Sequence, residues 1–133
     1  MRPRISIFLI DDDIDDQEIL ATIMEDSFEH AECTFASDGM QALHRLQDET
    51  FFPDVIFADI NMPRMNGIEF LVEFKKMPRL AEVPVFMYST SDEKEIVSQC
   101  TDLGATGFVK KYADTDEVKR EFQKIIHNIT SRS

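Results

Sequence analysis

The chain has 133 residues, which suits one domain of ordinary size, and its 43% apolar residues are enough to build a core. It carries 26 acidic and 14 basic side chains, a net charge of −12, and so acidic a protein is poorly suited to binding the phosphate backbone of nucleic acid. No apolar run approaches the ~18 residues that cross a bilayer, the run Ile5–Ile10 is too short for a secretion signal, and Cys33 and Cys100 form no disulfide framework. We therefore expect a cytoplasmic domain that binds neither membranes nor nucleic acid.

Five short apolar runs alternate with segments of helical period. The runs are near-continuous, as in strands buried on both faces of a parallel sheet, and they are Ile5–Ile10, Cys33–Ala36, Val55–Ala58, Val85–Tyr88 and Phe108–Val109. Apolar stripes of helical spacing lie over Ile19–Phe28, Ala42–Leu46, Ile68–Phe74, Ile96–Leu103 and Val118–Ile129. Strictly alternating strands and helices predict a doubly wound α/β fold with five parallel strands and five helices.

Residues suited to helix ends stand where this division needs them. Asp38 is expected to cap the second helix, Asp92 the fourth, and Asp114 or Thr115 the fifth, because short polar side chains accept hydrogen bonds from the first free amides. Gly104 follows the fourth stripe, at the position where glycine ends a helix.

The acidic surplus is concentrated directly after the first predicted strand, in five aspartates: Asp11, Asp12, Asp13, Asp15 and Asp16. A run of charge is usually a solvated face, but carboxylates crowded at a strand end repel one another and require a cation or another compensating group. Asp13 either adds a charge behind the site or begins the first helix, and we favour the helix start. Asp15 and Asp16 are expected to be solvated acids of the first turn, which complement the helix dipole.

Polar side chains also follow the other strands, and doubly wound sheets bind ligands at the carboxyl ends of their strands. Asp59 ends the third strand, Ser89 the fourth, and Lys110 and Lys111 the fifth. With the aspartates after the first strand, they bring three carboxylates, a hydroxyl and an ammonium to one edge. Carboxylate oxygens suit Mg²⁺, lysine suits a phosphoryl oxygen, and an aspartate can itself become an aspartyl-phosphate. The set predicts Mg²⁺-dependent phosphoryl chemistry.

These residues resemble the receiver domain of bacterial two-component response regulators. The likeness covers about residues 5–129 of a single domain of 1–133, and its most specific part is P-D-V-I-F-A-D-I-N-M-P-R-M-N-G at 53–67. The family's fold implies a flavodoxin-like sheet with strand order 2-1-3-4-5. The resemblance also implies that Asp59 is the phosphoacceptor, and that Mg²⁺ is held by Asp12 directly, by Asp11 largely through water, by Asp59 and by the backbone carbonyl of Asn61.

By the same resemblance, Ser89 and Lys111 contact the phosphoryl group, with Lys110 as the competing lysine. The motif G-A-T-G-F-V-K-K at 104–111 fits the family only if Lys111 is chosen. A histidine kinase or a histidine phosphotransfer protein would donate the phosphoryl group. Ser89 and Phe108 would then switch the face built from residues 96–103, 108–109 and 118–129, where a downstream protein or a second copy of the chain would bind.

The chain departs from the family after the lysine, where proline is usual and Tyr112 stands here. A cis bond without proline costs ~3–4 kcal/mol, so we expect the Lys111–Tyr112 bond to be either trans or strained. No output domain follows Ile129, so the expected form is a stand-alone receiver.

Two other interpretations remain open. A hydrolase of the haloacid-dehalogenase type would use Asp11 as its nucleophile, but its motif D-x-D-x-T requires a threonine where Asp15 stands. A receiver that binds partners without being phosphorylated is the second, although all the expected site positions are filled. The substitution Asp59→Asn separates these interpretations: a working receiver would lose phosphorylation, whereas the hydrolase would keep its Asp11 nucleophile.

Overall fold

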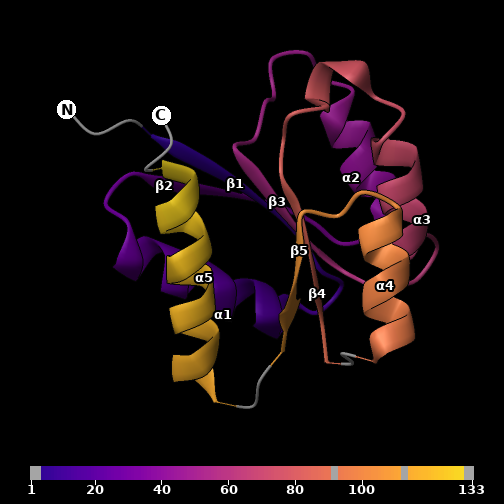
Figure 1. The fold of residues 1–133 in the computed structure, drawn as a ribbon. Helices are drawn as coiled ribbons and strands as arrows, with labels where there is room; N and C mark the ends of the chain where they lie inside the picture. Colours follow the sequence, from indigo (N-terminus) through magenta and orange to yellow (C-terminus); the bar gives the residue numbers. More distant parts are fainter. Residues whose placement is uncertain (1–3, 91–92, 112–113, 131–133) are drawn as a thin grey trace.

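The structure is a computed structural model that describes residues 4–90, 93–111 and 114–130 (Figure 1). Strands and helices alternate along the chain as β1 (Ile5–Ile10), α1 (Ile14–Ser27), β2 (Ala31–Ala36), α2 (Gly39–Leu46), β3 (Val55–Asp59), α3 (Gly67–Phe74), β4 (Val85–Ser89), α4 (Lys94–Asp102), β5 (Gly107–Lys110) and α5 (Thr115–Thr130). A short 3-10 helix, η1 (Pro78–Leu80), precedes β4 and was not predicted; it begins at a proline, whose fixed φ suits a first helical position.

The five strands form one parallel sheet in the order β2-β1-β3-β4-β5, which confirms the predicted doubly wound, flavodoxin-like fold. Ile10 pairs with Ala58 in the register of β1 and β3, and Asp59 pairs with Tyr88 in that of β3 and β4. The carboxyl ends of β1, β3 and β4 therefore lie level with one another, and the residues that follow them meet at one edge of the sheet.

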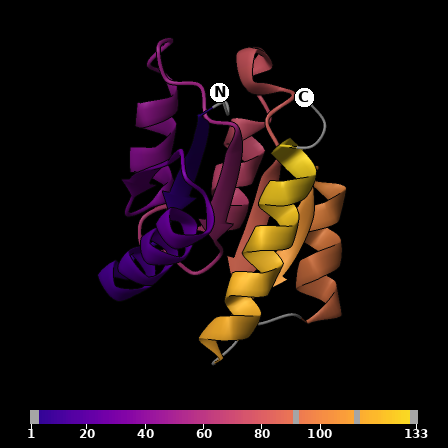
Figure 2. The same cartoon turned by 90° about the vertical axis from the view of Figure 1, so that its left-hand side faces the viewer.

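Helices cover both faces of the sheet. Helices α1 and α5 lie on one face and α2, α3 and α4 on the other, as two perpendicular views show (Figures 1 and 2). Successive residues of β1 serve different cores: Ile7 and Leu9 pack with α1 and α5, whereas Phe8 and Ile10 pack with α2, α3 and α4. This division explains why the strands read as near-continuous apolar runs.

Several predicted helix ends are confirmed. Asp38 caps α2 by accepting from the amide of Gln41 at 2.8 Å, and Asp114 accepts from the amide of Asp116 at 2.9 Å where α5 begins. Gly104 follows α4 with a φ of +98°, a conformation that glycine adopts without strain. The predicted cap Asp92 lies outside the described residues, and α4 begins at Lys94.

One position of the predicted apolar stripes is wrong. Ile19 is 46% exposed, because α1 presents Leu20, Ile23 and Met24 to the core and Ile19 lies about 100° around the helix from Leu20. Cys33 and Cys100 are free, as expected. None of the helices in the described part of the chain is long and apolar enough to cross a membrane.

Candidate functional site

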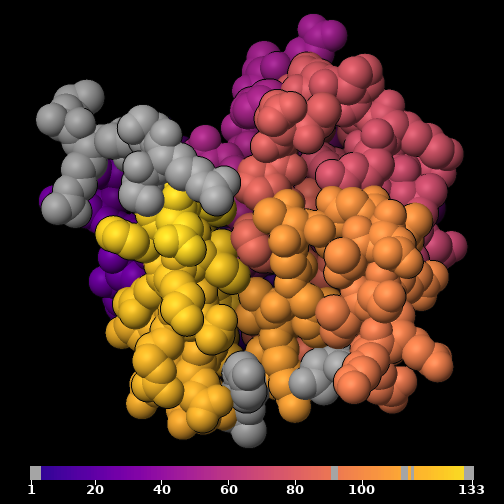
Figure 3. Space-filling model, in the orientation of Figure 1, coloured from indigo at the N-terminus to yellow at the C-terminus, as the bar shows by residue number. Residues whose placement is uncertain are grey.

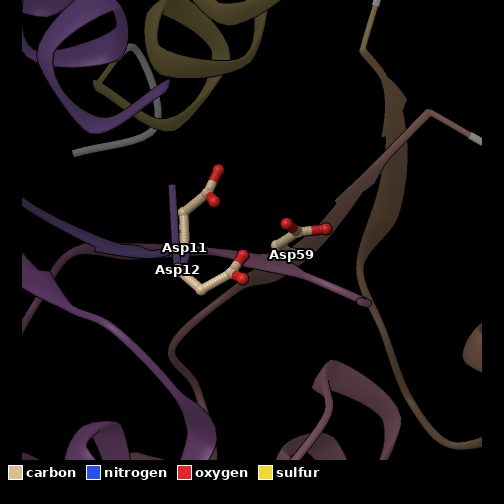
Figure 4. A group of neighbouring side chains, drawn as sticks. All are labelled: Asp11, Asp12 and Asp59. Carbon is tan, nitrogen blue, oxygen red and sulfur yellow. The ribbon is translucent and has the colours of Figure 1, made fainter. Parts of the chain in front are cut away.

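Three carboxylates gather at the carboxyl ends of β1 and β3. One oxygen from each of Asp11, Asp12 and Asp59 lies within 4.8 Å of the others, and the three side chains come from two neighbouring strand ends (Figure 4). Asp11 and Asp59 are buried, at 1% and 5% exposure, whereas Asp12 is open to solvent. The cluster therefore combines two buried acids with one solvent-exposed acid, Asp12.

Asp11 is held by the start of α1. Its Oδ1 accepts from the amide of Asp13 at 2.9 Å, and its backbone carbonyl accepts from Nε2 of Gln17 at 2.6 Å. Burial raises the pKa of Asp11 to about 6; the bond from Asp13 and the charge of Lys111 oppose this rise, and the charge of Asp59 adds to it. A second positive charge beside Asp11, in addition to that of Lys111, would further stabilise its ionised form.

Asp59 is fixed by the tight loop that follows β3. Its Oδ1 accepts from the amide of Asn61 at 3.3 Å, and the loop closes where the amide of Gly67 donates to the carbonyl of Ile60 at 2.9 Å. A Cβ on Gly67 would collide with the carbonyl oxygen of Asp59 and lie 2.8 Å from Cα of Ile60. Glycine is required because the start of α3 passes directly over the backbone of the site.

Asn61 lies on this loop, exposed and two residues after Asp59. The loop is further constrained at Arg64, whose φ of +65° is uncommon for a residue with a side chain. Arg64 pairs with the buried carboxylate of Asp38 at 3.7 Å, and the carbonyl of Met65 accepts from the amide of Gly39 at 3.2 Å. The loop is thus tied to the start of α2.

Lys111 reaches into the acidic cluster from the end of β5. Its Nζ lies 2.9 Å from Oδ2 of Asp59 and 3.1 Å from Oδ2 of Asp11, and it sits 4.8 Å from the centre of the Tyr88 ring. Burial lowers the pKa of Lys111, but hydrogen bonds to Asp59 and Asp16 and the nearby carboxylate charges outweigh it and raise that pKa overall. Lys111 is therefore held in its protonated form, with its positive charge beside Asp59. The structure places Lys110 on β5 in register with Ser89.

A fourth carboxylate, Asp16, also contacts Lys111, which corrects the expectation that Asp16 is solvated. Its Oδ2 lies 3.0 Å from Nζ, and the side chain is 31% exposed. The interpretation of Asp13 as the helix start is confirmed, since its side chain accepts from the amides of Asp15 and Asp16. A signal for Asp16 was present in the sequence: it precedes the buried Leu20 by four residues, so both lie on the inner face of α1.

Ser89 and Phe108 occupy the two positions of the predicted switch. Ser89 is 1% exposed at the end of β4, one residue beyond the pair Asp59–Tyr88, and its carbonyl accepts from the amide of Lys111 at 2.7 Å. Phe108 lies on β5, half-buried, and packs against the core that lies beneath α2, α3 and α4. Tyr112 and its peptide bond lie outside the described residues.

The donor set fits a hard divalent cation. Every candidate ligand atom of Asp11, Asp12 and Asp59 is oxygen, the donor that Mg²⁺ and Mn²⁺ prefer. The charges agree: two of the three clustered carboxylates, Asp11 and Asp59, share the ammonium of Lys111 with a further acid, Asp16. A divalent cation held by these oxygens would compensate the excess negative charge.

Comparison with known sequences identifies the family. A model of the response regulator receiver domain matches residues 7–123. A protein-glutamate methylesterase/protein-glutamine glutaminase of Rhodopseudomonas palustris is 36% identical over 113 residues, which are 84% of this chain and 30% of that protein. This chain therefore spans about a third of the length of such relatives.

Solved structures agree with this family. The phosphorylated cyanobacterial phytochrome response regulator RcpA is 26% identical, with a TM-score of 0.90 over 98% of this chain and 97% of that one. The Mn²⁺-bound response regulator Rcp1 is also 26% identical, with a TM-score of 0.82 over 92% of this chain and 91% of that one. The chain is a member of the response regulator receiver domain family of two-component signalling.

Proposed function

We propose that this chain accepts a phosphoryl group on Asp59 in a Mg²⁺-dependent reaction, and that the donor is the phosphohistidine of a sensor histidine kinase or of a histidine phosphotransfer protein. The observation that carries the proposal is the position of Asp59: it is buried, lies within 4.8 Å of two further carboxylates, and is 2.9 Å from the ammonium of Lys111. An acid in such surroundings is both restrained and charge-compensated.

The reaction requires little more than position and charge. A carboxylate oxygen of Asp59 forms the new O–P bond while the P–N bond of phosphohistidine breaks, and its electron pair returns to the imidazole nitrogen. The Lys111 ammonium is placed to stabilise charge on a phosphoryl oxygen. Ser89, at the end of β4, is the candidate hydroxyl donor to a second phosphoryl oxygen.

Asp11, Asp12, Asp59 and the carbonyl of Asn61 are the proposed Mg²⁺ ligands. When bound, the cation neutralises the clustered carboxylates and stabilises charge on the transferred group. The Mn²⁺-bound structure of the response regulator Rcp1 supports a divalent cation at this site, because that protein has the same fold. Burial disfavours the ionised form of Asp11, and a cation beside this carboxylate would stabilise that form.

The proposed consequence of phosphorylation is a structural change at the face formed by α4, β5 and α5. In Figure 3 this face is turned to the viewer, and β5 is visible between the two helices. Phe108 lies on that strand, three residues before Lys111, so a change at the phosphoryl site can reach the face through β5. A downstream protein or a second copy of the chain is the proposed partner there.

The direct test is the intact mass of the protein after incubation with Mg²⁺ and acetyl phosphate. The expected result is one labile phosphoryl adduct on the wild type, lost on treatment with hydroxylamine and absent from Asp59→Asn. Omitting Mg²⁺ or adding EDTA should suppress it. Here acetate is the leaving group, and no kinase is required.

Two controls separate the alternatives. An adduct that persists in Asp59→Asn but is lost in Asp11→Asn would assign the nucleophile to Asp11, as the hydrolase interpretation requires. No adduct from acetyl phosphate, nor from a panel of phosphorylated histidine kinases, in a protein that binds Mg²⁺ would leave a module that binds partners without phosphorylation.

A further inference from the structure

Asp16 reaches the site from an element that provides none of the clustered acids. It is the third residue of α1, whose first turn is fixed by the hydrogen bonds from the amides of Asp15 and Asp16 to the side chain of Asp13, at 2.9 and 3.3 Å. Leu20, one turn further along, is buried and anchors the same face of the helix. Asp16 is therefore directed at Lys111 by the helix that carries it.

The contacts of Lys111 separate Asp16 from the other two acids. An ammonium group has three N–H donors, and here three carboxylates accept from it at 2.9 to 3.1 Å: Asp11, Asp16 and Asp59. Asp11 and Asp59 also belong to the cluster that fits a cation. Within the described part of the chain Asp16 lies outside that cluster, so it serves the lysine and not the cation.

We infer, on the basis of the proposed function, that Asp16 is a positioning residue that holds the Lys111 ammonium beside α1, so that Asp11 and Asp59 can turn to a divalent cation while the lysine stays in the site. Without Asp16, the ammonium keeps only the two acids that the cation also needs, and it competes for them. Asp16 thus acts on cation binding through Lys111.

Isothermal titration calorimetry with Mg²⁺, on the whole chain, tests whether Asp16 affects Mg²⁺ affinity. Asp16→Asn is expected to weaken Mg²⁺ affinity roughly three- to tenfold, a size typical of coupled neighbours. The matched control is Asp15→Asn, which removes the same charge from the same turn of α1 at an exposed side chain. It should weaken affinity by less than about twofold, as screened surface charges do.

A double-mutant cycle tests the route through the lysine. In a Lys111→Met background, Asp16→Asn should weaken Mg²⁺ binding no more than Asp15→Asn does, because the competitor is gone. Asp16→Glu, which keeps the carboxylate, should restore most of the lost affinity, and it serves as the second variant if Asp16→Asn unfolds. If Asp16 had only a structural role, the effect of Asp16→Asn on Mg²⁺ affinity would not depend on Lys111.

The contrary outcomes are distinct. Equal weakening by Asp16→Asn and Asp15→Asn, or an Asp16→Asn effect that is undiminished in Lys111→Met, would overturn the inference and leave the proposed function intact. A wild-type protein that binds no Mg²⁺ at millimolar concentration would overturn both.

Discussion

The Nζ of Lys111 lies 2.9 Å from Oδ2 of Asp59, although the two residues are 52 positions apart in the chain. Asp59 ends β3 and Lys111 directly follows β5, and β4 lies between these two strands in the sheet, so the contact reaches across a strand. The side chain of Lys111 is 13% exposed and that of Asp59 7%, so the pair is largely shielded from water. Such a pair is strongly coupled to the stability of the fold.

Replacing Lys111 by methionine is therefore expected to lower the free energy of unfolding in EDTA by about 3 kcal/mol, because the buried carboxylates of Asp11 and Asp59 lose the ammonium group that compensates them. Mg²⁺ should recover much of this loss, since it compensates the same acids. Urea denaturation with and without Mg²⁺ measures both effects. The control is Lys76→Met, which breaks an exposed 3.1 Å pair with Glu73 and should cost less than about 1 kcal/mol. Equal losses for the two variants would contradict the buried-pair account.

Gly67→Ala separates helix propensity from close packing. Gly67 is the first residue of α3, where alanine would by propensity gain up to about 1 kcal/mol. The added Cβ would collide with the carbonyl of Asp59, so we expect instead a loss of about 2–3 kcal/mol and weaker phosphorylation. Thermal unfolding and the acetyl phosphate assay measure these effects.

Gly104→Ala is the comparison for Gly67→Ala. Its φ of +98° strains alanine, but its added Cβ would meet mainly the flexible end of the Lys75 side chain. A loss of about 1–2 kcal/mol with normal phosphorylation is expected, because Gly104 lies away from the site. If Gly67→Ala stabilised the protein, the expected collision between the added Cβ and the carbonyl of Asp59 would be contradicted.

The contrast between Asp59 and Asp16 indicates what a sequence can predict. Asp59, Ser89 and Lys111 stand at strand ends, and the rule that parallel strands end at one edge brings them together without any distances. Asp16 lies in a run of five aspartates where composition alone distinguishes none. Its contact with Lys111 depends on how α1 is rotated, and that rotation follows from the cap Asp13 and the buried Leu20.

Asp38→Ala should destabilise the protein by about 1–2 kcal/mol, through the loss of a buried helix cap. The carboxylate accepts from the amide of Gln41 and is 3% exposed. Its second partner, Arg64, is 70% exposed at 3.7 Å, so Arg64→Ala should change stability by less than about 0.5 kcal/mol. Urea denaturation distinguishes the two. Equal costs would show that the link between α2 and the loop after β3 matters more than the cap.

Mg²⁺ affinity should fall in acid because of Asp11. Burial raises the pKa of this carboxyl from 3.8 to about 6 in the metal-free protein. The protonated form is thus favoured by folding: the stability that Asp11 contributes is full below pH 4 and is lost as the pH rises through 6. A divalent cation binds the ionised form and acts in the opposite direction, lowering the pKa of Asp11.

Between pH 7.5 and pH 5, Mg²⁺ affinity is expected to weaken about tenfold, since one carboxylate must first lose its proton. Calorimetric titration at several pH values measures this, and proton release on binding should be small at pH 7.5, reach about half a proton near pH 6 and increase further below it. Asp11→Asn should bind Mg²⁺ more weakly at pH 7.5 and lose most of the pH dependence. A wild-type affinity that is equal at pH 5 and pH 7.5 would show that cation binding does not depend on ionisation of Asp11.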